Sequence, residues 1–435
     1  MADLTTNTAG IHSPNPFWLA SAPPTNTGDQ VARAFDAGWG GAVWKTLGQP
    51  IVNVWSRYAA MDINGVKMMG LNNIELITDR SLDINFKEMY EVKKRYPNHA
   101  VISSLMVASR EEFHELVKRS EDAGADGLEL NFGCPHGMSE RGLGAAVGQV
   151  PEYVQQMTEW VKEVSTIPVL VKLTPNVADI RYPARAAQAG GADGISLINT
   201  INSLMSVNLD TFAPNPNVDG WSSHGGYCGP AVKPIALNML SQITADPETA
   251  NIPISGIGGI SDWRDAAEFI LLGATSVQVC TAVMHYGFRI VEDMIEGLSN
   301  YLDEKGMTMD EIRGKSVPRI HSWQELDLNY VINASIDQEK CIGCGLCYTA
   351  CEDGAHQAIF AEPKADGRTF VEINTAACVG CNLCSLVCPV EDCISMVEIP
   401  NDYEKCSWMD YTTREGILAP RAEHEWRPVG GGEKT

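Results

Sequence analysis

The sequence predicts an α/β protein, a (β/α)8 barrel followed by a smaller C-terminal α+β domain. A helix end, then glycine or a small residue, then a short apolar strand recurs along roughly the first 300 of the 435 residues. Helical periods fill the gaps between these strands. Two regular runs of cysteine occupy the last hundred residues and indicate a separate domain.

The repeated unit is clearest at residues 36–46, 122–131, 188–199 and 271–280. In each copy a small residue or glycine, such as Gly124, ends a helix. Glycine at that position takes the left-handed conformation that closes a helix, and the chain then enters a buried strand directly.

Further strands are predicted at 17–21, 101–106, 168–173 and 253–257, with helices at 111–123, 151–164 and 263–272 among others. About eight strands alternating with helices favour a barrel. A doubly wound open sheet is the alternative. The chain offers it no GxGxxG fingerprint, because the stretch from Gly256 fails at its last position, Ser261.

The cysteine runs have the spacing Cys-x2-Cys-x2-Cys-x3-Cys, and Pro389 follows the second. This is the spacing of a bacterial ferredoxin-like module with two [4Fe–4S] clusters, in which the fourth cysteine of each run ligates the other cluster. One cluster is then expected to bind Cys341, Cys344, Cys347 and Cys388. The other is expected to bind Cys378, Cys381, Cys384 and Cys351. Zinc ribbons are disfavoured because they need only two CxxC pairs.

These patterns predict a barrel over 1–304, a connector over 305–333, the cluster domain over 334–398 and a polar tail over 399–435, an extended arm or a disordered end. The net charge of −23 excludes nucleic acid as a partner, since phosphate binding needs clustered Lys and Arg. No apolar run reaches the ~18–20 residues of a membrane span, and no signal peptide is visible. Eight of the thirteen cysteines lie in the runs, and an odd remainder argues against disulfides. We therefore expect a cytoplasmic protein without membrane contact.

Polar residues follow the predicted strands, where the active site of a barrel lies. Cys134 stands just after one strand, on a glycine-rich loop over 131–144. A thiol of ordinary pKa, about 8.5, is mostly protonated at neutral pH and suits a general acid. A small buried side chain is the alternative interpretation. His136 could be a second proton donor, although a structural role is favoured for it.

Glycines and polar residues after the seventh and eighth strands match the usual phosphate site of a barrel: Gly258, Gly259, Cys280 and Thr281. FMN is the natural occupant, because clusters move single electrons and a flavin converts these into hydride chemistry. Lys45 and Lys172, each directly after an apolar run, could stabilise negative charge on the reduced flavin.

These residues resemble the dihydroorotate dehydrogenase-like flavin barrel of dihydropyrimidine dehydrogenases, and are most similar to the flavin and iron–sulfur subunit of the bacterial NAD-dependent enzyme. The resemblance covers almost the whole chain. It is carried by Leu19-Ala20-Ser21-Ala22, Trp44-Lys45-Thr46, Asn73-Ile74-Glu75-Leu76-Ile77, Glu129-Leu130-Asn131, Cys134-Pro135-His136-Gly137, Val171-Lys172-Leu173-Thr174-Pro175-Asn176, Asn199-Thr200, Gly258-Gly259 and the cysteine runs.

The resemblance implies that Cys134 protonates C5 of a pyrimidine while reduced FMN passes hydride to C6. It implies that the ring's amide groups are held by Asn73, Asn131, Asn199 and Thr200. It further implies that the FMN-binding site is lined by Ala20, Ser21, Lys45, Thr46, Lys172, Gly229, Gly258, Gly259, Cys280 and Thr281.

The chain departs from the family pattern at three places. Gly133 stands where the animal enzymes have a serine that contacts substrate, which puts the choice between uracil and thymine in doubt. Glu352 replaces the proline that usually follows the fourth cysteine of the first run. Cys393 and Cys406 lie outside both runs and are interpreted as structural.

The chain carries no dinucleotide fingerprint, so the resemblance implies a separate FAD- and NAD(P)H-binding reductase subunit in a hetero-oligomer such as a heterotetramer. The expected activity is reversible reduction of uracil or thymine to the 5,6-dihydropyrimidine, that of an NAD-dependent dihydropyrimidine dehydrogenase. Three alternatives stay open. They are a self-sufficient enzyme reduced by a soluble ferredoxin, a dihydroorotate dehydrogenase, and an electron-transfer subunit whose barrel is catalytically silent.

Overall fold

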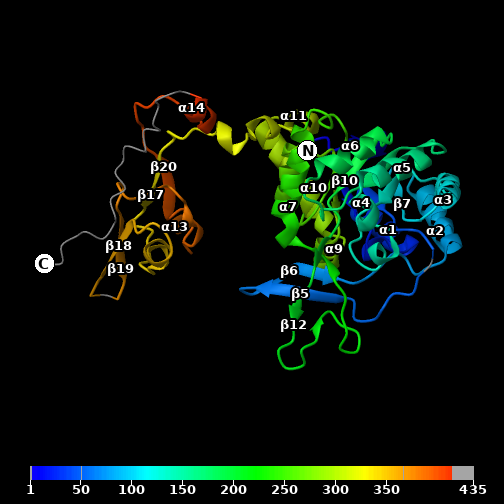
Figure 1. Cartoon of the computed structure of the whole chain (residues 1–435), viewed down its shortest axis with the longest axis horizontal. Helices are drawn as coiled ribbons and strands as arrows, with labels where there is room; N and C mark the ends of the chain where they lie inside the picture. The colour runs from blue at the N-terminus through cyan, green and yellow to red at the C-terminus, as the bar shows by residue number, and fades with distance from the viewer. Residues whose placement is uncertain (1, 50, 366, 414–435) are drawn as a thin grey trace. The chain divides into compact units, whose positions relative to one another are not determined.

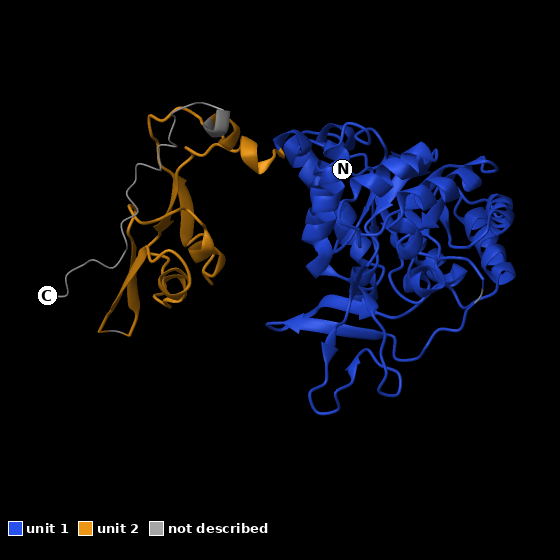
Figure 2. Ribbon diagram, viewed as in Figure 1, with its two compact units in different colours: residues 1–319 blue, residues 320–435 orange. Residues whose placement is uncertain are grey.

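The structure is a computed structural model that describes residues 2–49, 51–365 and 367–413. The chain divides into two compact units, Met1–Arg319 and Ile320–Thr435 (Figure 2). Each unit has its own buried core.

Eight parallel strands of the first unit close into a barrel, in the order β10-β15-β16-β3-β4-β7-β8-β9. In chain order they are β3 (Phe17–Leu19), β4 (Gly41–Val43), β7 (Ala100–Leu105), β8 (Gly127–Asn131), β9 (Val169–Lys172), β10 (Gly194–Leu197), β15 (Ile254–Ile257) and β16 (Ser276–Val279).

Helices surround the barrel, and their ends follow from local sequence. They are α1 (Gly28–Ala37), α2 (Leu82–Arg95), α3 (Arg110–Asp122), α5 (Pro151–Lys162), α6 (Arg181–Ala189), α7 (Lys233–Ala245), α8 (Trp263–Leu271) and α10 (Ile290–Lys305). The hydroxyl of Thr27 caps α1, and Gly38 ends it at φ +116°. Ser109 and Glu112 form a capping box at the start of α3. Shorter helices α4 (Ala145–Gly148), α9 (Thr281–Tyr286) and α11 (Met309–Ile312) lie between or after them.

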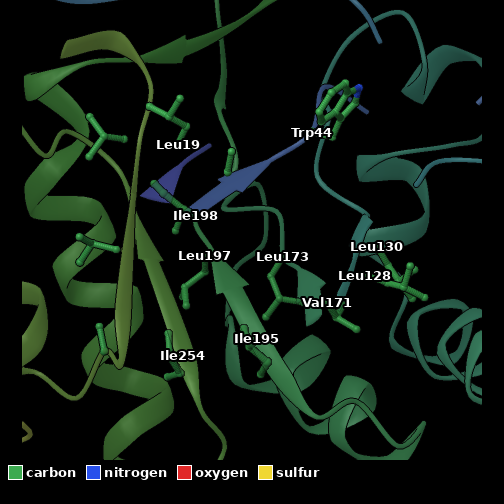
Figure 3. Packing of buried hydrophobic residues seen from close by; sticks show 14 of the residues in the cluster. Leu19, Trp44, Leu128, Leu130, Val171, Leu173, Ile195, Leu197, Ile198 and Ile254 are labelled. Carbon is green, nitrogen blue, oxygen red and sulfur yellow. The ribbon is translucent and has the colours of Figure 1, made fainter. Parts of the chain in front are cut away.

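The barrel core is built from strand side chains packed against the helices (Figure 3). Leu128, Leu130, Val171 and Ile195 are fully buried. Each such side chain contributes about 1.5–3 kcal/mol by leaving water. Because parallel strands are covered on both faces, their sequences are nearly continuous apolar runs. Such runs made the strands predictable from the sequence.

All eight predicted strands are present, and the closed barrel confirms the prediction over the open sheet. The predicted helices at 111–123, 151–164 and 263–272 correspond to α3, α5 and α8. The predicted connector over 305–333 contains the short helix α11.

The first unit also contains a four-stranded antiparallel sheet that the sequence did not predict, which we call the cap sheet. Its order is β11-β14-β6-β5, from β5 (Tyr58–Ile63), β6 (Val66–Asn73), β11 (Ile201–Ser203) and β14 (Gly225–Cys228). A ribbon of β12 (Ser206–Val207) and β13 (Pro214–Asn215) extends from it (Figure 1). A hairpin of β1 (Thr6–Thr8) and β2 (Ile11–Ser13) precedes the barrel, and buried Ile11 packs with Trp18 and Ile102 inside it.

The second unit contains two antiparallel pairs, β17 (Ile332–Ile336) with β20 (Ile394–Glu398) and β18 (Ile359–Pro363) with β19 (Thr369–Ile373). Short helices α12 (Leu346–Tyr348) and α13 (Leu383–Leu386) carry the middle of each cysteine run, and α14 spans Trp408–Thr413. Of the predicted tail, residues 414–435 lie outside the described residues. Among the described residues, no helix is long and apolar enough to cross a membrane.

Candidate active site

A pocket opens at the carboxyl ends of the barrel strands, beside the cap sheet. All the residues predicted to bind flavin line it: Ala20, Ser21, Lys45, Thr46, Lys172, Gly229, Gly258, Gly259, Cys280 and Thr281. So do Cys134 and the residues predicted to hold the pyrimidine, Asn73, Asn131, Asn199 and Thr200. The barrel therefore gathers residues from Ala20 to Thr281 around one space.

Three polar side chains in the pocket form a continuous hydrogen-bonded chain. The Asn131 amide donates to the Thr46 hydroxyl at 3.0 Å, and the Asn199 amide donates to the Asn131 carbonyl at 2.9 Å. Thr46 also lies 3.0 Å from the Ser21 hydroxyl. The Asn131 carbonyl also accepts from the Gly133 amide at 3.3 Å, and the Asn199 carbonyl accepts from the Thr200 amide at 2.8 Å, so both side-chain amides are held in one orientation.

Lys172 is the last residue of β9, and its ammonium lies 3.4 Å from the Glu129 carboxylate. Glu129 is fully buried and also accepts a hydrogen bond from the Gln278 amide at 2.9 Å. A buried charge is stable only when it is paired and hydrogen-bonded, so this network fixes the lysine at the barrel mouth.

Lys45 lies two residues past β4 and pairs with a different carboxylate, Glu75, at 3.2 Å. Both side chains are more than nine-tenths buried. Arg57 forms a second ion pair with the same Glu75 oxygen at 3.1 Å, and the Tyr58 hydroxyl donates to the other oxygen. Burial, followed by the hydrogen bond to Glu75, raises the pKa of Tyr58 well above its usual value, so its hydroxyl stays a donor.

Cys134 lies three residues past β8, with its thiol directed to the His136 carbonyl at 3.5 Å. Burial raises the pKa of Cys134 to about 11, while the charge of Lys45 opposes that rise. The His136 ring nitrogen Nε2 lies 3.0 Å from the Glu75 carbonyl, and burial lowers the pKa of His136. The cysteine is thus a protonated acid beside a neutral histidine.

The glycines after β15 allow the backbone to approach a ligand closely. Gly258 has φ +134° and Gly259 has φ +80°, conformations that other residues rarely adopt. A Cβ on Gly258 would lie 2.6 Å from that of Ala236, and one on Gly259 would lie 2.9 Å from the Gly229 carbonyl. This glycine-lined wall and the two buried lysines suit an anionic cofactor such as FMN.

The surroundings of Gly133 leave no room for a side chain at this position. A Cβ there would lie 2.4 Å from Asn199 Cβ and Nδ2. A serine at this position therefore requires Asn199 to move, and the chain of amides would move with it.

The second unit contains two cysteine-lined cavities. One is lined by Cys341, Cys344, Cys347 and Cys388, together with Cys393. The other is lined by Cys351, Cys378, Cys381 and Cys384. Each cavity thus combines three cysteines of one run with the fourth of the other, the grouping that the spacing predicts. Within the described residues, no group of three or more His, Cys, Asp or Glu is arranged to hold a single metal ion.

Pocket residues that the sequence did not predict include Tyr58, Glu75, Cys228 and Gln278. Tyr58 and Cys228 belong to the missed cap sheet. Gln278 occupies an inward position in β16, where its amide reaches Glu129 across the barrel. Glu75 could have been found, because a carboxylate within the apolar stretch 74–77 needs a buried cation as partner.

A barrel with this pocket, joined to a unit with two cysteine-lined cavities, defines a redox enzyme of the flavin-barrel class. The chain belongs to the dihydroorotate dehydrogenase family, whose model matches residues 3–302. A 4Fe-4S dicluster domain matches residues 334–396. Together these matches imply FMN in the barrel and two clusters in the second unit.

The chain is 44% identical over 359 residues to the NAD-dependent dihydropyrimidine dehydrogenase subunit PreA of Escherichia coli K12, covering 82% of this chain and 87% of that protein. It is 41% identical over 328 residues to the chloroplastic dihydropyrimidine dehydrogenase (NADP(+)) of Arabidopsis thaliana, covering 72% and 77%. The catalytic subunit of dihydroorotate dehydrogenase B (NAD(+)) of Pyrococcus abyssi is 37% identical over 303 residues, covering 70% and 95%.

Proposed function

We propose that the chain is the catalytic subunit of an NAD-dependent dihydropyrimidine dehydrogenase, an oxidoreductase that reduces uracil or thymine reversibly at the 5,6 double bond. The observation that carries the proposal is the protonated Cys134 thiol in one pocket with three asparagines and two lysines. The identity with the two dihydropyrimidine dehydrogenases supports it.

The pyrimidine ring is held by amide side chains. A uracil edge alternates N–H donors with C=O acceptors, and a carboxamide side chain carries both a donor and an acceptor group. The hydrogen bond from Asn199 to Asn131 and that from Asn73 to the Gly226 carbonyl, both 2.9 Å, orient these groups before substrate arrives. Orientation of this kind lowers the entropic cost of reaching the transition state.

Cys134 supplies the proton. Reduction of the double bond adds a hydride at C6 and a proton at C5, and the thiol gives the proton and then recovers one from solvent. Because burial keeps the thiol protonated, the acid is ready throughout the neutral range. FMN supplies the hydride when it is bound, and Lys45 and Lys172 neutralise the negative charge of its reduced form.

Electrons enter from a partner. The sequence carries no dinucleotide fingerprint, and the relative of Escherichia coli is named as a subunit. We infer a partner reductase subunit that binds FAD and NAD(P)H. The eight cysteines of the runs would hold two [4Fe–4S] clusters, which would supply one-electron transfer between that reductase and the barrel.

Oxidation of dihydroorotate is the second candidate, because the Pyrococcus abyssi relative carries that activity in its name. Its substrate bears a carboxylate that needs a cation. Among the described residues, the pocket lining includes no arginine, and its two lysines are the residues assigned above to the reduced flavin. The pocket therefore favours a neutral pyrimidine. It also argues against a catalytically silent barrel, because the loop cysteine and both lysines are retained.

The test compares Cys134→Ala with the unchanged chain in uracil reduction. We expect turnover to fall by roughly 10²–10⁴-fold, the contribution of a positioned general acid, while FMN stays bound. Cys406→Ser, which changes a buried cysteine outside the pocket and both cavities, serves as the control and should keep full turnover. Unchanged turnover in Cys134→Ala would refute the assigned role. Faster oxidation of dihydroorotate than of dihydrouracil would instead favour the second candidate.

A further inference from the structure

Glu75 joins parts of the pocket that are far apart in the sequence. One carboxylate oxygen accepts from Lys45 at 3.2 Å and from Arg57 at 3.1 Å, and the other accepts from the Tyr58 hydroxyl. The Glu75 side chain is only 9% exposed. A single buried anion at the pocket wall therefore binds two cations and one hydroxyl group at the same time.

The cap sheet creates this arrangement. Tyr58 of β5 pairs with Asn73 of β6, so the chain before Tyr58 runs beside the chain after Asn73. The Ile74 amide donates to the Arg57 carbonyl at 3.0 Å, which extends the pairing by one step. The Arg57 side chain is fixed a second time, because its Nε donates to the Val54 carbonyl at 2.7 Å.

The backbone around Glu75 also supports the cysteine loop. Its carbonyl lies 3.0 Å from His136 Nε2. The neighbouring Leu76 and Cys134 pack against the same small apolar cluster, and a Cβ on Gly137 would lie 2.4 Å from Leu76. Removing only the Glu75 charge would leave these contacts in place, so the carboxylate can be tested separately from the loop.

We propose that Glu75 is a positioning residue whose carboxylate holds the Lys45 ammonium at the flavin face of the pocket and sets how much positive charge faces the flavin. This rests on the proposed function, since it requires FMN in the barrel. Glu75 acts through Lys45 and touches neither the hydride nor the proton that is transferred.

Two variants of this group should shift the reduction potential of the flavin in opposite directions. With Glu75 ionised, the group of Lys45, Arg57 and Glu75 carries a net charge of +1. Glu75→Gln raises this to +2 and Arg57→Met lowers it to zero. Positive charge stabilises the anionic, reduced form of a flavin, and it does so strongly where water is excluded. The reduction potential should therefore become more positive in the first variant and more negative in the second.

The experiment measures the FMN potential of the full-length chain by dye-coupled spectroscopic titration, together with kcat and KM for uracil. Glu75→Gln should raise the potential and lower kcat on the order of 10²-fold through misplacement of Lys45, with KM little changed. Glu75→Asp keeps the charge and should restore the potential to near that of the unchanged chain. Glu140→Gln removes an exposed carboxylate from the cysteine loop and serves as the matched control, with no shift.

The possible results distinguish a failure of the proposed function from a failure of the role of Glu75. Failure of the unchanged chain to bind FMN or reduce uracil would overturn the proposed function itself. Normal FMN binding with the same potential in Glu75→Gln and Glu140→Gln would overturn the role of Glu75 alone. If Glu75→Gln then also had a lower melting temperature than the unchanged chain, the ion pairs of Glu75 would be purely structural. If Glu75→Gln does not fold, a potential in Arg57→Met that is unchanged or more positive overturns the role equally.

Discussion

A buried thiol can serve as an acid only if its surroundings keep it neutral, and Cys134 meets this condition. Its environment disfavours the thiolate, because burial removes the water that would solvate it. Lys45 acts in the opposite direction, but desolvation is the larger effect. The residue is therefore suited to giving a proton rather than to attacking a substrate as a nucleophile.

The raised pKa of Cys134 sets the expected pH dependence of uracil reduction. Uracil reduction should be flat across neutral pH and decline only as the pH rises toward about 11, where Cys134 loses its proton. At pH 8 the thiolate fraction of a thiol with that pKa is smaller than that of an ordinary cysteine by roughly 10²-fold. Alkylation of Cys134 by iodoacetamide, followed by mass spectrometry of its peptide, should slow accordingly relative to the unfolded chain. A rate of reduction that falls by half near pH 8.5 would contradict this expectation.

The sequence predicted the residues of the pocket that are tied to strand ends, because barrel topology brings all strand ends to one face. Lys45, Asn131 and Lys172 are of this kind. It could not predict which carboxylate each lysine meets, since Glu75 reaches Lys45 only through the register of the cap sheet.

At the level of secondary structure, the cap sheet is the main feature that the periodicity analysis missed. Strand β5 is mostly exposed, so it lacks the apolar alternation of a half-buried strand. A local signal was nevertheless present. Asn64-Gly65 lies between the two strands, and both residues have positive φ, 49° and 82°, as a type I′ hairpin turn requires.

Substitution of this turn should loosen the pocket wall without disturbing the barrel. A Cβ added to Gly65 would meet no atom within 4 Å, so Gly65→Ala adds backbone strain alone, about 1–2 kcal/mol. Hydrogen exchange in β5 and β6 should accelerate by roughly 5- to 30-fold, with barrel strands unaffected. Gly65→Asn should change exchange much less, because asparagine tolerates this conformation. Equal exchange in both variants would show that the turn does not limit opening of the hairpin.

For the whole molecule, the two compact units divide the chemistry. The barrel gathers its pocket from strands along 300 residues, and the second unit gathers its cavities from two cysteine runs. The exchange of fourth cysteines was predictable because it depends on local spacing. The place of Cys393 in the first cavity was not, because it lies five residues past the second run and enters through β20 and its turn.

Loss of one cluster should therefore separate electron supply from pyrimidine chemistry. Cys344 and Cys381 are the exposed members of their runs, so Cys344→Ser and Cys381→Ser remove a cluster ligand with little loss of packing. We expect both variants to retain FMN and to reduce uracil when dithionite is the electron source. Turnover driven by NADH through the partner reductase should fall to background, and the iron content should drop. Cys406→Ser, outside both cavities, should behave as the unchanged chain. Full NADH-driven turnover in either ligand variant would mean that electrons reach the barrel without passing through the clusters.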